Sequence, residues 1–187
     1  MTIRSFIAIE LGDKEKRSLE LIQNKMKREL PTVRWVKPNT IHLTIKFLGY
    51  IEESEIPRIK EIINTAAENC RPFQMRLSGL GAFPNARNPR VIWIGVREES
   101  GVLKQLAAEL ERLLAEIGVE PEDRAFSAHL TLGRVKERGG RDVFSSVLPT
   151  FKDEDAGEMR VDKISLIRSD LTPQGPIYST LHRAELQ

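Results

Sequence analysis

Ile41-His42-Leu43-Thr44-Ile45 decides how this chain is organised, because its pattern recurs 87 residues later as Ala128-His129-Leu130-Thr131-Leu132. In both copies polar and apolar residues alternate, which is the two-residue period of a β-strand with one buried face. The histidine and the threonine of each copy therefore share one face of their strand. Two of the three histidines of the chain lie in this repeated pattern. The repeat predicts two equivalent strands, each carrying an imidazole beside a hydroxyl.

Strands and helices alternate around the two motifs. A two-residue apolar period or a short apolar run predicts strands at 6–9, 33–36, 41–48, 73–77, 91–96, 127–135, 161–168 and 177–183. Apolar stripes of helical period predict helices at 14–30, 54–70 and 100–117, with one or two helical turns at 141–148. Asp13 is the expected cap of the first helix. Because no low-complexity linker divides the chain, we expect residues 1–187 to form one α+β domain.

Composition leaves the function open but indicates the class of protein and its cellular compartment. The chain is 40% apolar and 30% charged, and its net charge of +2 permits a polyanionic partner without requiring one. The single cysteine, Cys70, belongs to an apolar helical stripe and cannot form an internal disulfide. No run approaches the roughly 18 apolar residues of a membrane span, and the opening residues do not read as a secretion signal. We expect a soluble, reduced, cytoplasmic protein with no membrane contact.

The two imidazole–hydroxyl pairs suit chemistry at one phosphate group. One neutral histidine can deprotonate water while the other, charged, donates a proton to the leaving oxygen, and the hydroxyls can bind the remaining oxygens. Histidine fits both roles because its unperturbed pKa is about 6.5. A single His-x-Thr is also common in purely structural strands, so this interpretation depends on the repeat. No metal-ligand spacing is present, so no metal is predicted, and His182 is expected to be structural.

Longer segments around the motifs resemble a known family. The chain resembles the 2H phosphoesterases, and within them the RNA 2′,3′-cyclic phosphodiesterase (LigT/ThpR) family. The resemblance covers nearly the whole chain and is carried by five segments: Arg4-Ser5-Phe6-Ile7-Ala8-Ile9-Glu10, Val33-Arg34-Trp35-Val36-Lys37-Pro38 leading to His42-Leu43-Thr44-Ile45-Lys46-Phe47-Leu48-Gly49, Val91-Ile92-Trp93-Ile94-Gly95-Val96, Phe126-Ser127-Ala128-His129-Leu130-Thr131-Leu132-Gly133-Arg134, and Leu166-Ile167-Arg168-Ser169.

The resemblance implies a bilobal α+β fold in which two pseudo-symmetric lobes, each with an antiparallel sheet and helices, flank a cleft that holds both motifs. It implies hydrolysis of RNA ends or nucleotides that bear a 2′,3′-cyclic phosphate to 2′-phosphomonoesters, without metal or other cofactor. Carried over to this chain, His42 donates the proton to the leaving oxygen and His129 is the base for water. Thr44 and Thr131 hold the phosphate. We expect a monomer.

Two further positions match family sites but conflict with a regular strand. Arg134 matches a position that contacts the phosphate, and Phe47 matches one where an aromatic ring can stack on the terminal base. Strict alternation places both with the core residues, so either the strand bends or they do not face the cleft. The chain also has Ala128 where the family more commonly has proline, which should loosen the segment before His129.

Two other functions use the same features. A 2′–5′ RNA ligase would run the opening of the cyclic phosphate with an RNA 5′-hydroxyl in place of water, and the same two histidines would serve it. A non-catalytic nucleotide- or RNA-binding module would keep the cleft for recognition. Retention of both His-x-Thr motifs argues against the binding module, because recognition alone does not require two proton-transfer groups.

Overall fold

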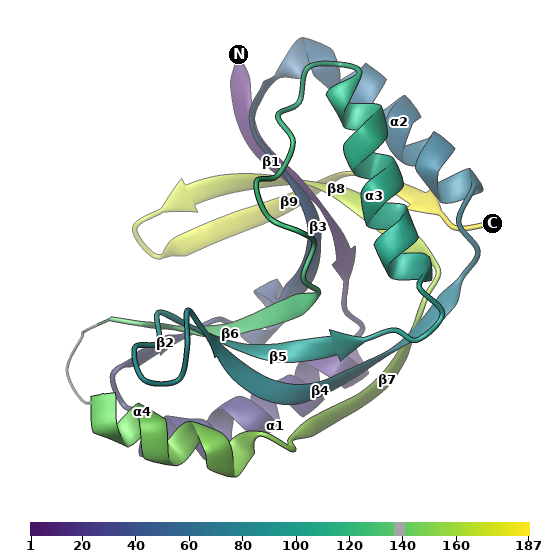
Figure 1. Ribbon diagram of the computed structural model, residues 1–187. Helices are drawn as coiled ribbons and strands as arrows, with labels where there is room; N and C mark the ends of the chain where they lie inside the picture. The colour runs from purple at the N-terminus through teal and green to yellow at the C-terminus, as the bar shows by residue number, and fades with distance from the viewer. Residues whose placement is uncertain (137–140) are drawn as a thin grey trace.

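A computed structural model describes residues 1–136 and 141–187, and these residues form two antiparallel sheets with helices around them (Figure 1). The first sheet has the strand order β3-β1-β8-β9, and the second has the order β2-β6-β5-β4-β7. The strands are β1 (Thr2–Glu10), β2 (Val33–Trp35), β3 (His42–Glu52), β4 (Phe73–Phe83), β5 (Val91–Arg97), β6 (His129–Val135), β7 (Asp155–Val161), β8 (Lys163–Thr172) and β9 (Gly175–Glu185). The helices are α1 (Asp13–Glu29), α2 (Ile56–Glu68), α3 (Val102–Ala115) and α4 (Arg141–Val147). The predicted α+β class is confirmed.

The two sheets have equivalent centres. β1 lies between β3 and β8, and β5 lies in the same way between β6 and β4. A His-x-Thr motif opens the strand beside each central strand, since β3 begins at His42 and β6 at His129. This correspondence explains the repeated motif, because each copy occupies the same place in its own sheet.

One helix that follows each sheet's central strand in the chain packs against the other sheet. Helix α1 follows β1 of the first sheet but contacts β7 of the second, whereas α3 follows β5 of the second sheet but contacts β3 of the first. Figure 1 shows α1 and α4 on the side of the second sheet and α2 and α3 toward the first. The apolar stripes of the helices and the inner faces of both sheets form one buried cluster. None of the helices in the described residues is long and apolar enough to span a membrane.

Both motif strands contain a bulge at the fourth residue of the motif. β1 pairs Ile7 with Lys46 and Ala8 with Thr44, which leaves Ile45 as an extra residue in β3. β5 pairs Ile92 with Gly133 and Trp93 with Thr131, which leaves Leu132 as the extra residue in β6. An extra residue reverses the inward–outward alternation beyond it. The residues after each motif therefore face the opposite way from what strict alternation predicts.

Two predicted element boundaries were wrong. Asp13 is the first residue of α1 rather than its cap, and the cap position is taken by Gly12, which has no side chain to bond the first turn. The predicted strand at 161–168 is two strands, because β7 ends at Val161 and β8 begins at Lys163. In β7 the alternation is weak, since polar residues and Gly157 interrupt it.

Candidate active site

His42 is held at the start of β3 by its backbone and by two aromatic rings. Its Nδ1 lies 2.9 Å from the carbonyl oxygen of Thr40, the last residue of a 3-10 turn, Pro38–Thr40. Its ring stacks on Phe6 with centroids 4.6 Å apart, and Tyr178 packs edge-on at 5.2 Å. This burial lowers the pKa of His42 from its ordinary value, and the Thr40 carbonyl and the Glu10 carboxylate oppose that effect.

His129 is held in the same way at the start of β6. Its Nδ1 lies 2.7 Å from the carbonyl oxygen of Ser127. The rings of Phe83 and Trp93 pack edge-on against it, with centroid distances of 5.0 Å and 6.4 Å. Each histidine is therefore anchored to the carbonyl two residues before it.

The matched anchoring fixes the tautomer of both rings. A carbonyl oxygen only accepts hydrogen bonds, so Nδ1 must carry the proton that it donates. The neutral form of each ring then has a proton-free Nε2, which can act as a base, and the charged form has a proton on Nε2 that it can donate. These anchors were not predicted, because the residues that supply them, Thr40 and Ser127, contribute through backbone atoms that any residue has.

Thr44 and Thr131 lie where the repeat predicted them. Thr44 is two residues along β3 from His42 and pairs with Ala8, and Thr131 is two residues along β6 from His129 and pairs with Trp93. Both side chains are partly exposed. Within the residues that the structure describes, neither hydroxyl forms a hydrogen bond, so both remain available to a ligand.

Phe47 and Arg134 face outward, which corrects the alternation argument for both. The bulges at Ile45 and Leu132 reverse the alternation, so each of these residues points to the face of its histidine. Phe47 is 53% exposed and lies 6.2 Å from the Phe6 ring that supports His42. The predicted core position of Phe47 was therefore wrong. The two residues are equivalent, because each follows its motif histidine by five positions.

The two sheets approach each other around Tyr178. Strand β3 contacts β6, so the strands that carry the two motifs are neighbours. Tyr178, on β9 of the first sheet, packs against His42. Burial raises the pKa of the Tyr178 hydroxyl, and the positive charges of Arg4 and Arg134 oppose that rise. Arg134 of the second sheet therefore lies near a ring that touches His42.

Sequence reasoning missed the aromatic residues around both histidines. Phe6 lies on the neighbouring strand β1, and Tyr178 lies on the last strand, far from His42 in the chain. Phe83 is the last residue of β4, where the predicted strand had already ended. The only available signal was the position of Phe6 and Trp93 inside predicted strands. Their packing against a histidine depends on strand order, which one sequence does not reveal.

His182 and Cys70 lie apart from the two motifs. The Nε2 of His182 is 2.7 Å from Oδ1 of Asn64 on α2, and burial together with the charge of Lys60 lowers the pKa of His182. Burial raises the pKa of the Cys70 thiol, which favours the uncharged form. The structural environment predicted for both side chains is the one they have.

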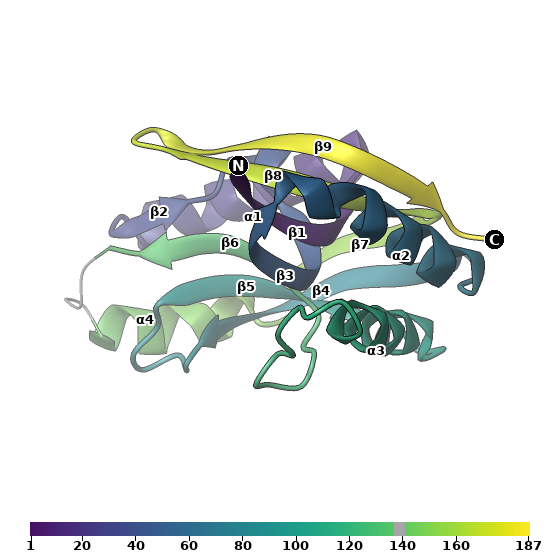
Figure 2. The same ribbon diagram turned by 90° about the horizontal axis from the view of Figure 1, so that it is seen from above.

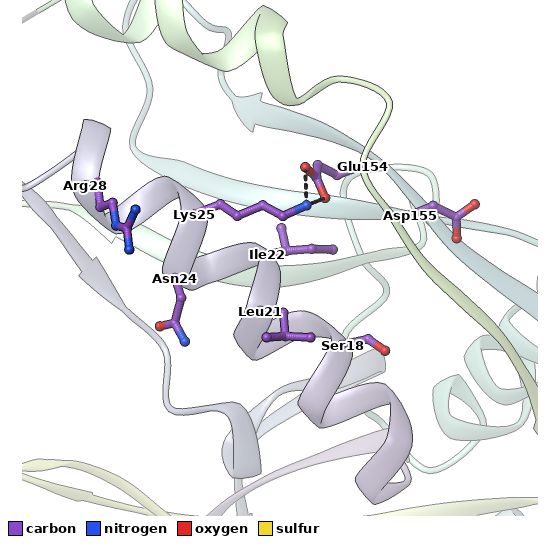
Figure 3. Close-up of a pocket in the computed structure, with 8 residues that line it drawn as sticks. All are labelled: Ser18, Leu21, Ile22, Asn24, Lys25, Arg28, Glu154 and Asp155. Carbon is purple, nitrogen blue, oxygen red and sulfur yellow. Dashed lines mark hydrogen bonds and ion pairs between the residues drawn. The ribbon is translucent and has the colours of Figure 1, made fainter.

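Two hollows of the described surface contain neither histidine. One hollow of about 450 Å³ lies along α1, where Lys25 bridges to Glu154 (Figure 3). A second, of about 540 Å³, lies between the end of β3 and the segment after α3, and Phe47 forms part of its lining. Among the described residues no group of three or more His, Cys, Asp or Glu side chains is placed to hold a metal ion.

Comparisons with known proteins agree with the duplicated architecture. The model of the family described as LigT like Phosphoesterase matches this chain twice, at residues 9–93 and 94–178. A protein of Methanothermobacter thermautotrophicus named RNA 2′,3′-cyclic phosphodiesterase is 35% identical over 97% of both chains. One of the same name from Archaeoglobus fulgidus is 36% identical over 96% of this chain and 98% of its own. A crystal structure of a Thermus thermophilus protein superposes with a TM-score of 0.85 at 30% identity, over 98% of both chains. With two copies of the family pattern spanning most of its length, the chain belongs to the LigT-like phosphoesterase family.

Proposed function

We propose that this protein hydrolyses RNA 2′,3′-cyclic phosphates to 2′-phosphomonoesters, with His42 and His129 as the proton-transfer pair and without a metal ion. The observation that carries the proposal is the matched anchoring of both rings through Nδ1, at 2.9 Å and 2.7 Å from backbone carbonyls. It leaves Nε2 of each ring as the atom that exchanges protons. The names of the relatives supply the substrate class.

In the proposed reaction His129 is the base and His42 the acid. Nε2 of neutral His129 takes a proton from a water molecule, whose oxygen bonds to phosphorus. The bond from phosphorus to the 3′-oxygen breaks, and that oxygen takes the proton from Nε2 of charged His42. The product is a 2′-phosphomonoester with a free 3′-hydroxyl. Exchange with solvent then returns each ring to its starting protonation state.

The low pKa of His42 fits the role of the acid once substrate is bound. Burial makes the charged ring a strong proton donor, but it also reduces the charged fraction in the free protein. The negative charge of the bound phosphate favours the charged ring and restores that fraction. Thr44, Thr131 and Arg134 are proposed to bind the non-bridging phosphate oxygens. Phe47, whose exposed ring lies on the His42 face, is proposed to stack on the terminal base.

The direct test is turnover of a 2′,3′-cyclic nucleotide in the presence of EDTA. We expect a 2′-phosphomonoester as product, with His42→Ala and His129→Ala each lowering the rate by about 10²-fold or more. The double variant should be little worse than the slower single variant, because paired catalytic groups act as a unit. His182→Ala is the matched control and should stay within a few-fold of the wild type. Tight binding without turnover would instead indicate a binding module, and a need for added divalent ion would overturn the metal-free mechanism.

An activated aryl phosphodiester separates the two roles. Its phenolate leaves without a proton, so the variant that lacks the acid should recover much of its rate. We expect recovery in His42→Ala and not in His129→Ala. Recovery in His129→Ala alone would reverse the assignment.

A further inference from the structure

Three arginines surround the hairpin that joins β8 to β9. Arg34 and Arg134 are directly opposite each other on the neighbouring strands β2 and β6. A Cβ atom added to Gly175, at the turn of the hairpin, would lie 3.8 Å from Nη2 of Arg34. Arg4 and Arg134 both act electrostatically on Tyr178 of the same hairpin. Figure 1 and Figure 2 show the hairpin on the same side of the molecule as β2 and β6.

These charges have little internal compensation. Arg4 donates to the hydroxyl of Ser169 at 2.9 Å, which is a neutral partner. Within residues 1–136 and 141–187, Arg34 and Arg134 form no ion pair, and both are exposed. The nearby Asp170 pairs with Arg168 at 2.9 Å. Like charges held close together without counter-charges repel, and a bound anion relieves that repulsion.

The hollow next to Phe47 has the opposite charge. The hollow beside Phe47 is lined by the four glutamates Glu52, Glu55, Glu120 and Glu122. Carboxylates there disfavour a phosphate chain, while the arginines favour one. The glutamates beside Phe47 and the exposed arginines Arg34 and Arg134 by the β8–β9 hairpin therefore differ in the sign of their charge, and an anionic chain is favoured at the arginines.

We propose that Arg34 binds the last internucleotide phosphate of an RNA 3′ end, so that the preferred substrate is an oligonucleotide rather than a cyclic mononucleotide. This inference rests on the proposed function. In an RNA ending in a cyclic phosphate, the terminal 2′- and 3′-oxygens are both occupied, so the chain continues only through the 5′-oxygen. With the cyclic phosphate between His42 and His129 and in reach of Arg134, the neighbouring guanidinium of Arg34 is the next cation.

The first experiment compares a cyclic mononucleotide with a trinucleotide that ends in a 2′,3′-cyclic phosphate. For the wild type, kcat/KM should be about tenfold higher on the trinucleotide, as expected for one charge-assisted hydrogen bond. Arg34→Ala should remove that preference while leaving the rate on the mononucleotide unchanged, which also shows that the variant is folded. Arg58→Ala, at an exposed arginine of α2, is the matched control and should behave as wild type.

A neutral linkage tests the contact itself. Replacing the last internucleotide phosphate by a methylphosphonate should lower wild-type kcat/KM to the level of Arg34→Ala and should not affect that variant further. The fall of kcat/KM with salt should be steeper for the trinucleotide than for the mononucleotide, and the difference should vanish in Arg34→Ala.

The outcomes separate the two proposals. If neither substrate is hydrolysed, the proposed function fails. If the mononucleotide is hydrolysed but the trinucleotide is no better, or if Arg34→Ala lowers both rates equally, the proposed function stands and the role of Arg34 is overturned.

Discussion

The two histidines have the same backbone anchor but different surroundings. His42 stacks face to face on Phe6, whereas His129 has only edge-on aromatic neighbours among the described residues. Burial lowers the pKa of His42, and among the opposing effects is the charge of Glu10, the residue that pairs with His42 across the strands. Burial alone would raise the pKa of Glu10, but hydrogen bonds from Arg183 and Ser165 keep it below its ordinary value, so Glu10 is charged near neutral pH.

Glu10→Gln should lower the pKa of His42 further, because the substitution removes a negative charge that favours the charged imidazole. The pKa can be measured by NMR titration of the ring protons, with His129 as the internal control. If His42 is the acid, the alkaline limb of kcat/KM should move to lower pH in this variant. A higher His42 pKa in Glu10→Gln would contradict the electrostatic argument.

At the scale of single residues, the sequence predicted which side chains form the two pairs but not what tunes them. His42 and Thr44 could be placed on one face from spacing alone, because they precede the bulge. Phe47 and Arg134 could not, because they follow it. Burial lowers the pKa of His42, and Phe6 and Tyr178, which pack on the ring, lie on other strands, as does Glu10, whose charge opposes the effect of burial. Only the opposing Thr40 carbonyl is local in the chain, and strand neighbours are set by the tertiary fold.

At the scale of elements, each bulge allows one strand to place both its motif and a residue beyond the motif on the same outward face. The motif itself presents histidine and threonine outward, and the bulge then turns a later residue, Phe47 or Arg134, to the same face. The residue just before Phe47 in β3, and the residue just before Arg134 in β6, both face inward. In β3 this residue is Lys46, and in β6 it is Gly133. Lys46 reaches acceptors on Glu111 and Glu120, whereas Gly133 lies against Val33 and Trp35 and has no room for a side chain.

Gly133→Ala should destabilise the second sheet. An added Cβ would lie 2.5 Å from Cγ1 of Val33 and 3.1 Å from Cε3 of Trp35, both on β2. Val33 is β-branched and stiff, so β2 must move, and we expect the free energy of unfolding to fall by about 1–3 kcal/mol. Urea denaturation measures this loss.

A double-mutant cycle identifies the cause of that loss. In a Val33→Ala background the nearest clashing atom is absent, so Gly133→Ala should cost less there than in the wild type. Additive effects of the two substitutions would show that the contact with Val33 is not the source of the destabilisation.

Lys46→Met should loosen the segment that leads to the second motif. The Lys46 side chain is 2% exposed, and its Nζ bonds Glu111 at 2.9 Å and the Glu120 carbonyl at 2.7 Å. Glu111 also accepts from the backbone of Glu122. Methionine keeps the length but leaves these acceptors without the ammonium, so we expect a loss of about 1–3 kcal/mol in the free energy of unfolding.

Hydrogen exchange locates that effect. The amide of Glu122 should exchange faster in Lys46→Met than in wild type, because the carboxylate that it bonds loses its partner. Lys104→Met, at an exposed position of α3, is the control and should change neither quantity. Unchanged exchange at Glu122 would mean that Lys46 does not hold this segment.

At the scale of the whole molecule, the family resemblance implied two pseudo-symmetric lobes, and the family pattern at 9–93 and 94–178 confirms the duplication. The sequence did not predict that the repeats interleave. β8 from the second half pairs with β1 from the first, and β4 from the first half pairs with β7 from the second. Each sheet therefore contains strands of both halves. Local periodicity defines elements, but long-range pairing depends on side-chain packing between distant segments.

This interleaving predicts that the two sheets unfold together. Helix α1 leaves the first sheet to contact the second, and α3 does the reverse, so opening either sheet exposes apolar surface of the other. The Lys46–Glu111 ion pair adds a contact between β3 and α3. We therefore expect residues 1–187 to behave as one cooperative domain, with a single two-state transition in urea.

The histidines provide a local probe for each sheet. In NMR spectra recorded across a urea titration, the folded signals of His42 on the first sheet and His129 on the second should disappear at the same midpoint. A substitution that destabilises one sheet should lower both midpoints equally, and Gly133→Ala in the second sheet is the suitable case. If that variant lowered the His129 midpoint while the His42 midpoint stayed at the wild-type value, the sheets would be independent folding units, and the exchanged helices would not couple them.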